Sequence, residues 1–234
     1  MAISGAYEFS PGRAAAAEAA VALMEPDMTI GLGSGRGVWS VIEAIGARFT
    51  GGHEIKAVVA SEATFALASA AGMEIVQLDG ELVLDIAVDG ADEVGPDLQL
   101  LKGGGGALLR EKIVAAAAER FVVVAETSKK VDRVGEGFRL PVEIVRFGWR
   151  DTRRRLADLL PDSELRVVGD EPYMTDQLHY ILDCKIPEST DPYELDPALQ
   201  EVPGVVDHGL FLGIAERALL GTQVGEVEVI ERSG

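Results

Sequence analysis

Four consecutive glycines separate a lysine from a charged helical run in the segment "KGGGGALLREKIVA", residues 102–115. Each glycine loses backbone entropy when the chain folds and supplies no side chain for packing, so a run of four needs a reason. Bare backbone can approach a ligand closely, and the start of the next helix offers free N–H groups to an anion. The segment therefore predicts a ligand-binding loop at the start of a helix.

The helix after the glycines carries three adjacent charged residues, Arg110, Glu111 and Lys112, in an otherwise apolar sequence. Consecutive helical positions are about 100° apart, so the three side chains span about 200° of the helix surface. We expect at least one of them to face inward or into a cleft. In such a place the charged form of a glutamate is disfavoured, which moves its pKa toward the range of a general base. An exposed cluster of ion pairs is the alternative.

A glycine-rich turn with a basic residue follows the first apolar run. In "GLGSGRG", residues 31–37, the Gly-Lys-Ser/Thr ending of a P-loop is absent, and Arg36 stands where a dinucleotide-binding loop has its third glycine. The segment predicts a flexible turn that leads into a helix N-terminus, where an anion is favoured. A tight turn without any ligand fits the same residues.

Carboxylates and a lysine follow two further apolar runs. "VDGADEV" supplies Asp89, Asp92 and Glu93, which could bind sugar hydroxyls, move a proton or hold a metal. On spacing alone a solvated turn is slightly favoured, because Asp and Gly are common turn residues. "AETSKKVD" supplies Lys129, which could bring positive charge to an anionic ligand, although lysines in surface loops usually only contact water.

The apolar runs before these loops are expected to be strands of one sheet. They alternate with alanine-rich helical segments and cover residues 28–33, 54–61, 73–78, 82–90, 98–102 and 121–126. This alternation indicates an α/β fold with parallel strands, whose functional loops gather at the carboxyl ends of the strands. From about Val134 the pattern suggests a small α+β unit, and from about Val206 short apolar strands are expected to rejoin the first sheet.

Composition restricts the classes of function. The 234 residues are 47% hydrophobic and include 27 glycines, which suits a globular α/β protein. The formal net charge of −18 disfavours nucleic acid and anionic membranes as partners. A single cysteine, Cys184, and the lack of a signal-like or membrane-spanning segment predict a cytoplasmic protein. The three scattered histidines argue against zinc binding.

Taken in order, the segments "GLGSGRG", "SEAT", "VDGADEV", "KGGGGALLREKIV", "AETSKKVD", "LPVEIV" and "PGVVDHGLF" resemble the type A ribose-5-phosphate isomerases. The similarity extends over nearly the whole chain, and "VDGADE" and "KGGG-A-L-REKI" are its most specific parts. The resemblance implies interconversion of ribose 5-phosphate and ribulose 5-phosphate in the pentose phosphate pathway, by proton transfer, with no metal and no other cofactor.

The resemblance also implies a domain organisation. Residues 1–133 plus 207–234 would form a Rossmann-like catalytic domain with a parallel sheet. Residues 134–206 would form a smaller α+β domain, inserted before the C-terminal strands, that makes oligomer contacts. Members of the family are usually dimers or tetramers, so a homodimer or homotetramer is expected.

Individual roles follow from the same resemblance. Glu111 would be the proton acceptor, and Lys102 would steady negative charge on the reacting oxygens. Asp89 and Asp92 would contact the sugar and assist ring opening and proton transfer between oxygens, and Lys129 would bind substrate. The other expected substrate contacts are Ser34, Gly35, Arg36 and Gly37 in the phosphate loop, Gly90 and Ala91 in the acidic loop, and Gly103, Gly104 and Gly105 beside the lysine.

The phosphate loop departs from the family pattern, which is commonly Gly-Thr-Gly-Ser-Thr and here is Gly-Ser-Gly-Arg-Gly. Phe65 likewise stands where the family tends to carry a hydroxyl residue. The reaction type is therefore better supported than the substrate, and a related sugar phosphate or a free pentose stays open as the substrate.

Two other classes of function remain as alternatives. A non-catalytic sugar-phosphate-binding module of a transcription regulator would need a DNA-binding helix-turn-helix, for which neither end of the chain leaves room. A dinucleotide-dependent reductase is disfavoured by Arg36 and by the lack of an acidic ribose partner after the second strand.

Overall fold

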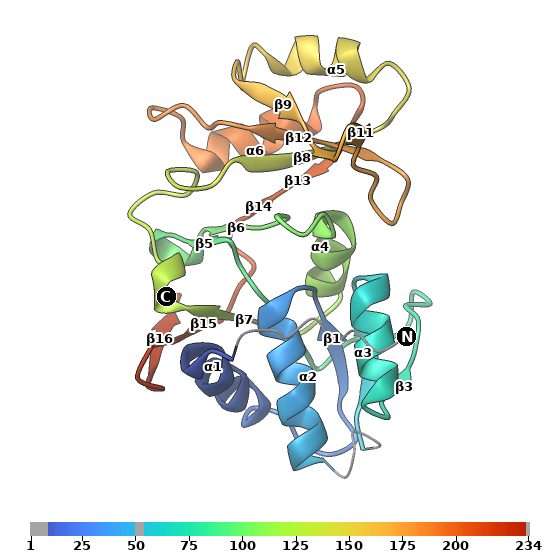
Figure 1. Cartoon of the computed structure of the whole chain (residues 1–234), viewed down its shortest axis with the longest axis vertical. Coiled ribbons are helices and arrows are strands. Elements are labelled where there is room, and N and C mark those ends of the chain that lie inside the picture. Colours follow the sequence, from blue (N-terminus) through green and yellow to red (C-terminus); the bar gives the residue numbers. More distant parts are fainter. Residues whose placement is uncertain (1–8, 50–53, 233–234) are drawn as a thin grey trace.

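The computed structural model describes residues 9–49 and 54–232 (Figure 1). A large unit consists of a seven-stranded sheet and the helices that flank it. A smaller unit, above it in Figure 1, contains a four-stranded sheet. A short three-stranded sheet lies between the two units. The site described below is built at the level of this short sheet.

The seven-stranded sheet is parallel except at one edge, where β16 runs antiparallel to β15. Its strands, in spatial order, are β16 (Val227–Glu231), β15 (Arg217–Gly221), β7 (Phe121–Glu126), β4 (Ile86–Asp89), β1 (Thr29–Leu32), β2 (Lys56–Val59) and β3 (Glu74–Ile75). Strands that follow β1 in the chain lie on one side of it up to β3 and on the other side from β4 onward. Such a switch point leaves a crevice at the carboxyl ends of the strands.

Helices cover both faces of this sheet, which explains its near-continuous apolar strands. In β7, Val122 and Val124 belong to one apolar cluster with residues of the helices α1 (Pro11–Val21), α2 (Arg36–Arg48) and α3 (Glu62–Ala70). The alternate residue Val123 points to the opposite face and belongs to a second cluster, with residues of α4 (Leu108–Ala116). The expected α/β fold with a parallel sheet is confirmed.

The remaining strands form the smaller unit and the short sheet. The four-stranded sheet has the order β13 (Val205–His208), β8 (Leu140–Ile144), β12 (Tyr180–Cys184) and β9 (Ser163–Leu165), all antiparallel. It is accompanied by α5 (Trp149–Leu156), α6 (Pro192–Gln200) and the hairpin of β10 (Val167–Val168) and β11 (Glu171–Pro172). The short sheet has the order β14 (Leu210–Phe211), β6 (Leu100–Leu101) and β5 (Glu93–Val94).

Two details differ from the sequence-based expectation. The run at residues 98–102 was expected in the parallel sheet, but β6 pairs antiparallel with β5 and β14. A short apolar run is equally suited to either kind of buried sheet, so the pattern could not distinguish them. The C-terminal strands also divide, since β15 and β16 join the large sheet whereas β13 pairs with β8.

The division into residues 1–133 plus 207–234 and residues 134–206 therefore stays a proposal, and its second boundary falls inside β13. Within the described ranges, no helix is long and apolar enough to cross a membrane.

Candidate active site

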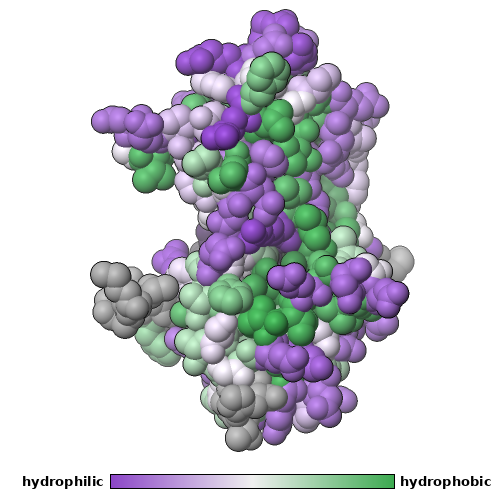
Figure 2. Space-filling view, turned by 90° about the vertical axis from the view of Figure 1, so that its right-hand side faces the viewer, coloured by the Kyte–Doolittle hydropathy of each residue, from purple (hydrophilic) through white to green (hydrophobic). Residues whose placement is uncertain are grey.

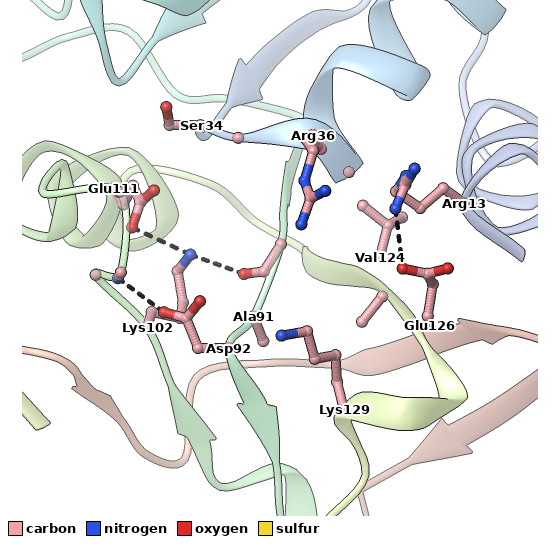
Figure 3. A pocket seen from close by; sticks show the side chains of 17 residues that line it. Arg13, Ser34, Arg36, Ala91, Asp92, Lys102, Glu111, Val124, Glu126 and Lys129 are labelled. Atoms are coloured by element: carbon pink, nitrogen blue, oxygen red, sulfur yellow. Dashed lines mark hydrogen bonds and ion pairs between the residues drawn. The ribbon is translucent and has the colours of Figure 1, made fainter. Parts of the chain in front are cut away.

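A pocket opens at the carboxyl ends of the parallel strands, beside the switch point between β1 and β4 (Figure 3). The loops after the parallel strands β1, β4 and β7 line it, as their shared carboxyl edge predicts, and the loop after β6 of the short antiparallel sheet lines it too. The lining includes all the site residues expected from the sequence except Asp89, namely Ser34, Gly35, Arg36, Gly37, Gly90, Ala91, Asp92, Lys102, Gly103, Gly104, Gly105, Glu111 and Lys129.

A buried lysine between two carboxylates forms the floor of the site. The Lys102 ammonium lies 2.9 Å from Asp89 Oδ2 and 3.1 Å from Glu111 Oε2, and donates a hydrogen bond of 2.7 Å to the Gly90 carbonyl. Lys102, Asp89 and Glu111 are 3%, 2% and 5% exposed. Burial of this kind makes the attraction between the charges stronger than it would be in water.

The same burial shifts the pKa values of all three groups. Burial raises the pKa of Glu111 to about 8, and the nearby Asp89 charge adds to the rise while Lys102 opposes it. Burial also raises the pKa of Asp89, again against the influence of Lys102. Burial alone would lower the pKa of Lys102, but the two carboxylates outweigh it and raise that pKa. A glutamate with a pKa near neutrality can both take and return a proton.

Glycines around Asp89 explain part of the local sequence. Asp89 ends β4, and its Oδ1 accepts hydrogen bonds from the amides of Gly90 at 2.7 Å and Ser34 at 3.2 Å. A Cβ atom on Gly33 would lie 1.8 Å from Asp89 Cγ, so this position requires glycine. Gly33, the first residue after β1, thus allows the carboxylate to sit beside the backbone.

The glycine loop (residues 103–106) holds the second aspartate. The Gly104 amide donates a hydrogen bond of 2.8 Å to Asp92 Oδ2, which Figure 3 marks with a dashed line. A Cβ atom on Gly104 would lie 2.8 Å from the other oxygen of the same carboxylate. The loop ends at α4, whose first turn contains Glu111. The glycines therefore let the backbone approach Asp92 closely and lead directly to the buried glutamate.

Cationic side chains gather at the other end of the pocket. Arg36 is the first residue of α2, which has no side-chain cap. Figure 3 shows its side chain extending into the pocket and Lys129 pointing inward from the loop after β7, with Arg13 lining the far wall. Positive charge beside the free N–H groups of a helix start is suited to an anion such as a phosphate.

Comparison with known proteins gives a family. The model of the family "Ribose 5-phosphate isomerase A (phosphoriboisomerase A)" matches residues 56–225. This chain belongs to that family. It is 46% identical to ribose-5-phosphate isomerase A of Shouchella clausii over 90% of this chain and 92% of the relative. The corresponding protein of Deinococcus radiodurans is 43% identical over 92% of this chain and 95% of the relative.

Solved structures agree with the sequence comparison. The ribose 5-phosphate isomerase from Plasmodium falciparum superposes with a TM-score of 0.90 and 30% identity, over 95% of this chain and 98% of that one. A D-ribose-5-phosphate isomerase in complex with phospho-erythronic acid superposes with a TM-score of 0.88 and 35% identity, over 94% of this chain and 97% of that one. The ribose 5-phosphate isomerase A fold therefore extends over 94–95% of this chain.

Sequence reasoning missed an ion pair in the pocket of this ribose 5-phosphate isomerase A family member. Arg13 and Glu126 both line the pocket, with Arg13 Nη1 3.0 Å from Glu126 Oε2. Ser10, which caps α1, donates a hydrogen bond of 2.5 Å to Glu126 Oε1. Glu126 ends β7, so the argument that identified Lys129 could have found it. The sequence around Arg13 gives no comparable signal, because Arg13 follows no strand expected from the sequence and is 113 residues before its partner Glu126.

Three charged residues near the predicted site lie outside the pocket. Arg110 pairs with Glu62 and Asp176, and Lys112 pairs with Asp207. Of the three adjacent charges in α4, Glu111 is therefore the one that enters the pocket. Glu93 is buried and accepts hydrogen bonds from the Gly135 and Gly137 amides. Across the described residues, no group of three His, Cys, Asp or Glu side chains could hold a metal ion.

Proposed function

We propose that this chain interconverts ribose 5-phosphate and ribulose 5-phosphate by proton transfer through an enediolate. The observation that carries the proposal is the buried Glu111, whose pKa is raised to about 8 beside the Lys102 ammonium. This pair offers a base and a cation within one pocket. Membership in the ribose 5-phosphate isomerase A family supplies the substrate and the reaction.

The reaction needs one base that acts twice. Glu111 takes the proton from C2 of the open-chain aldose, the C–H electron pair becomes the C1=C2 bond, and negative charge develops on O1. Lys102 and backbone N–H groups stabilise this charge as it forms. The O2 proton moves to O1, and Glu111 returns its proton to C1, which leaves the carbonyl at C2. No proton or electron is gained or lost in the balance.

The two aspartates differ in their access to substrate. Asp92 lines the pocket and is held by the Gly104 amide, so it can carry the proton between O2 and O1 and assist ring opening. Asp89 lies behind Lys102 and is bound by two amides, so in this proposal it acts mainly by fixing the ammonium. Arg36, Arg13 and Lys129 would receive the phosphate, and they supply local positive charge in a chain of net charge −18.

Isomerisation of a related sugar phosphate or of a free pentose is the second candidate, because of the altered phosphate loop. Purified protein should convert ribose 5-phosphate faster than ribose or arabinose 5-phosphate. In D₂O the product should carry solvent deuterium, since the proton on Glu111 exchanges during transfer. A chain without turnover of ribose 5-phosphate would contradict the proposed function, and a product without deuterium would contradict the enediolate route.

We further propose that the protein acts as a homodimer or homotetramer in the cytoplasm. Figure 2 shows a band of hydrophobic residues across the face on which α3 and α4 lie, extending over both units. Exposed apolar residues on this part of the chain include Phe65 of α3 and Ile113 of α4. Continuous apolar surface of this kind is common at protein interfaces. Light scattering of the purified protein would measure the mass, and a monomer would contradict the proposal.

A further inference from the structure

Side chains of the small unit bind the glycine loop, although none of them lines the pocket. Arg166, which follows β9, donates hydrogen bonds from Nη1 to the carbonyls of Gly103 at 2.9 Å and Gly104 at 3.1 Å. Tyr173, which follows β11, donates a hydrogen bond of 3.2 Å to the Gly105 carbonyl. Three successive carbonyls of the loop are thus held from the small unit.

Arg166 is itself fixed in place. Its Nε lies 2.9 Å from Asp183 Oδ2 and its Nη2 lies 2.5 Å from Asp183 Oδ1, and Asp183 belongs to β12 inside the four-stranded sheet. The Arg166 side chain is 14% exposed. A bidentate pair of this kind holds the guanidinium plane, so its remaining N–H groups have a defined direction. Those groups are the ones that reach the glycine loop.

The hydrogen bonds from Arg166 determine where the amides of the loop point. In a trans peptide the C=O and the N–H point in opposite directions, and the described residues contain no cis peptide. The Gly103 carbonyl shares its peptide with the Gly104 N–H, which donates to Asp92. The Gly104 carbonyl shares its peptide with the N–H of Gly105, which lines the pocket. A guanidinium on one side of the loop therefore orients the groups that contact Asp92 and the pocket on the other side.

Packing against Tyr173 reinforces this arrangement. Gly106 has a φ of 81°, and a Cβ atom there would lie 2.2 Å from the Tyr173 hydroxyl oxygen. The Arg166 guanidinium carbon is also 5.8 Å from the centre of the Tyr173 ring. The loop therefore has contacts with the small unit along its whole length, and a change in those contacts would move it.

We propose that Arg166 is a positioning residue for the site, acting through the glycine loop on Asp92 and on the Gly105 amide. This inference rests on the proposed isomerase reaction. Arg166 touches neither the phosphate end of the pocket nor the buried Lys102 ammonium. Its loss should therefore impair the chemical step and leave the binding of substrate through its phosphate almost unchanged.

Arg139 provides a matched control. It lies in the same small unit, forms an ion pair of 2.9 Å with Asp162 and donates a hydrogen bond of 3.3 Å to the Asp183 carbonyl, but it makes no contact with the glycine loop. We expect Arg166→Ala to lower kcat by about 10- to 100-fold, the effect of small misplacements in a site, with KM within about threefold of wild type. Arg139→Ala should keep kcat. Equal kcat values in the two variants would overturn the proposal.

A second measurement does not depend on activity. The Gly104 amide is bonded to Asp92 and the Gly106 amide to the Gly103 carbonyl, so both should exchange slowly with D₂O. Mass spectrometry of peptides that cover residues 102–108 should show faster exchange in Arg166→Ala than in wild type or Arg139→Ala. Unchanged exchange in Arg166→Ala would overturn the positioning role of Arg166, whether or not the wild type is active. A wild type that is inactive on ribose 5-phosphate would contradict only the proposed function.

If Arg166→Ala does not fold, Arg166→Lys addresses the same question. A single ammonium cannot pair with both Asp183 oxygens and also bond two carbonyls, so kcat should stay low although the charge is kept. Wild-type kcat and exchange in Arg166→Lys would show that charge alone suffices, and would overturn the proposed role of the guanidinium.

Discussion

Glu111 owes its chemical character to its burial and to two charged neighbours, Asp89 and Lys102. Burial and the Asp89 charge raise its pKa, whereas the Lys102 ammonium stabilises its charged form. Without the lysine, two carboxylates this deeply buried could not both be ionised. Without the second carboxylate, one contribution to the rise would be lost, so the pKa of Glu111 would lie lower and Glu111 would be a weaker base. The cluster thus balances these opposing effects near neutral pH.

Replacing Glu111 by Gln should abolish turnover without unfolding the protein. The amide keeps the shape of the side chain but cannot accept a proton from carbon, and loss of a general base lowers the rate by about 10²–10⁴-fold. Glu119→Gln is a suitable control, because Glu119 is an exposed glutamate outside the pocket. Steady-state kinetics and binding of a substrate analogue would separate the two effects. Wild-type kcat in Glu111→Gln would remove this residue from the mechanism.

The raised pKa of Glu111 also predicts opposite pH dependences for activity and stability. The base must be deprotonated, so kcat/KM of the free enzyme should rise as the pH increases through about 8. Between the ordinary pKa of a glutamate and about 8, the folded state binds a proton that the unfolded state does not. The stabilisation from this group is fully present below that ordinary pKa and is lost as the pH rises through about 8.

Glu111→Gln has no proton to lose at this position, so its stability does not change through the titration of Glu111. From about pH 5 to about pH 9, a range that includes the pKa of about 8, the Tm of Glu111→Gln should therefore rise relative to the Tm of wild type. Thermal unfolding of both proteins in matched buffers would measure the difference. A constant difference in Tm across the range would show that Glu111 titrates at its ordinary pKa.

At the scale of elements, the start of α2 and the loop after β7 face each other across the pocket. Arg36 begins α2, where the amides of the first turn have no partner within the helix, and its side chain extends into the pocket. Lys129 ends the short 3₁₀ helix Thr127–Lys129 that follows β7. A phosphate between them would receive charge from side chains and direction from the helix start.

Arg36→Ala should raise KM for the sugar phosphate much more than it lowers kcat. A charge-assisted hydrogen bond contributes about 1.5–3 kcal/mol, which corresponds to roughly ten- to a hundredfold in binding. Lys130→Ala is the control, because Lys130 is exposed and pairs with Glu228 outside the pocket. The effect should disappear with a substrate that has no phosphate. An unchanged KM in Arg36→Ala would show that backbone N–H groups, Arg13 and Lys129 bind the phosphate without Arg36.

The sequence predicted which elements carry the site better than it predicted strand pairing and the contacts between distant residues. Strand ends followed by glycine or charge identified the loops after β1, β4 and β7, because parallel strands bring their carboxyl ends to one edge. The pairing of β6 was wrong, since two apolar residues carry no information on strand direction. Arg13 and Arg166 were missed for a related reason, because each meets the site through contacts between residues far apart in the chain.

At the scale of the whole molecule, the two units are hydrogen-bonded to each other through the backbone around the buried Lys102. The Lys102 amide donates to the Gly209 carbonyl at 2.8 Å, and the Gly209 amide donates to the Pro141 carbonyl of β8 at 2.8 Å. Arg166 adds its contacts to the next two residues of the chain. The segment from β6 to the glycine loop thus has hydrogen-bonded partners in the small unit and in the chain that leads from it, so the site depends on the small unit being folded.

This coupling predicts that the two units unfold together. The chain contains two tryptophans, Trp39 in α2 of the large unit and Trp149 in α5 of the small unit. Trp39 packs against the apolar core that α1 and α2 form with the large sheet. The centres of the Trp149 and Tyr180 rings are 6.4 Å apart in the small unit. Each variant with one tryptophan, Trp149→Phe or Trp39→Phe, therefore reports on one unit.

In each variant the fluorescence midpoint in urea should coincide with the midpoint of circular dichroism, which reports on both units, as two-state unfolding requires. A fluorescence midpoint that precedes or follows the dichroism midpoint would show that one unit unfolds alone, and that the contacts around Lys102 do not couple the two.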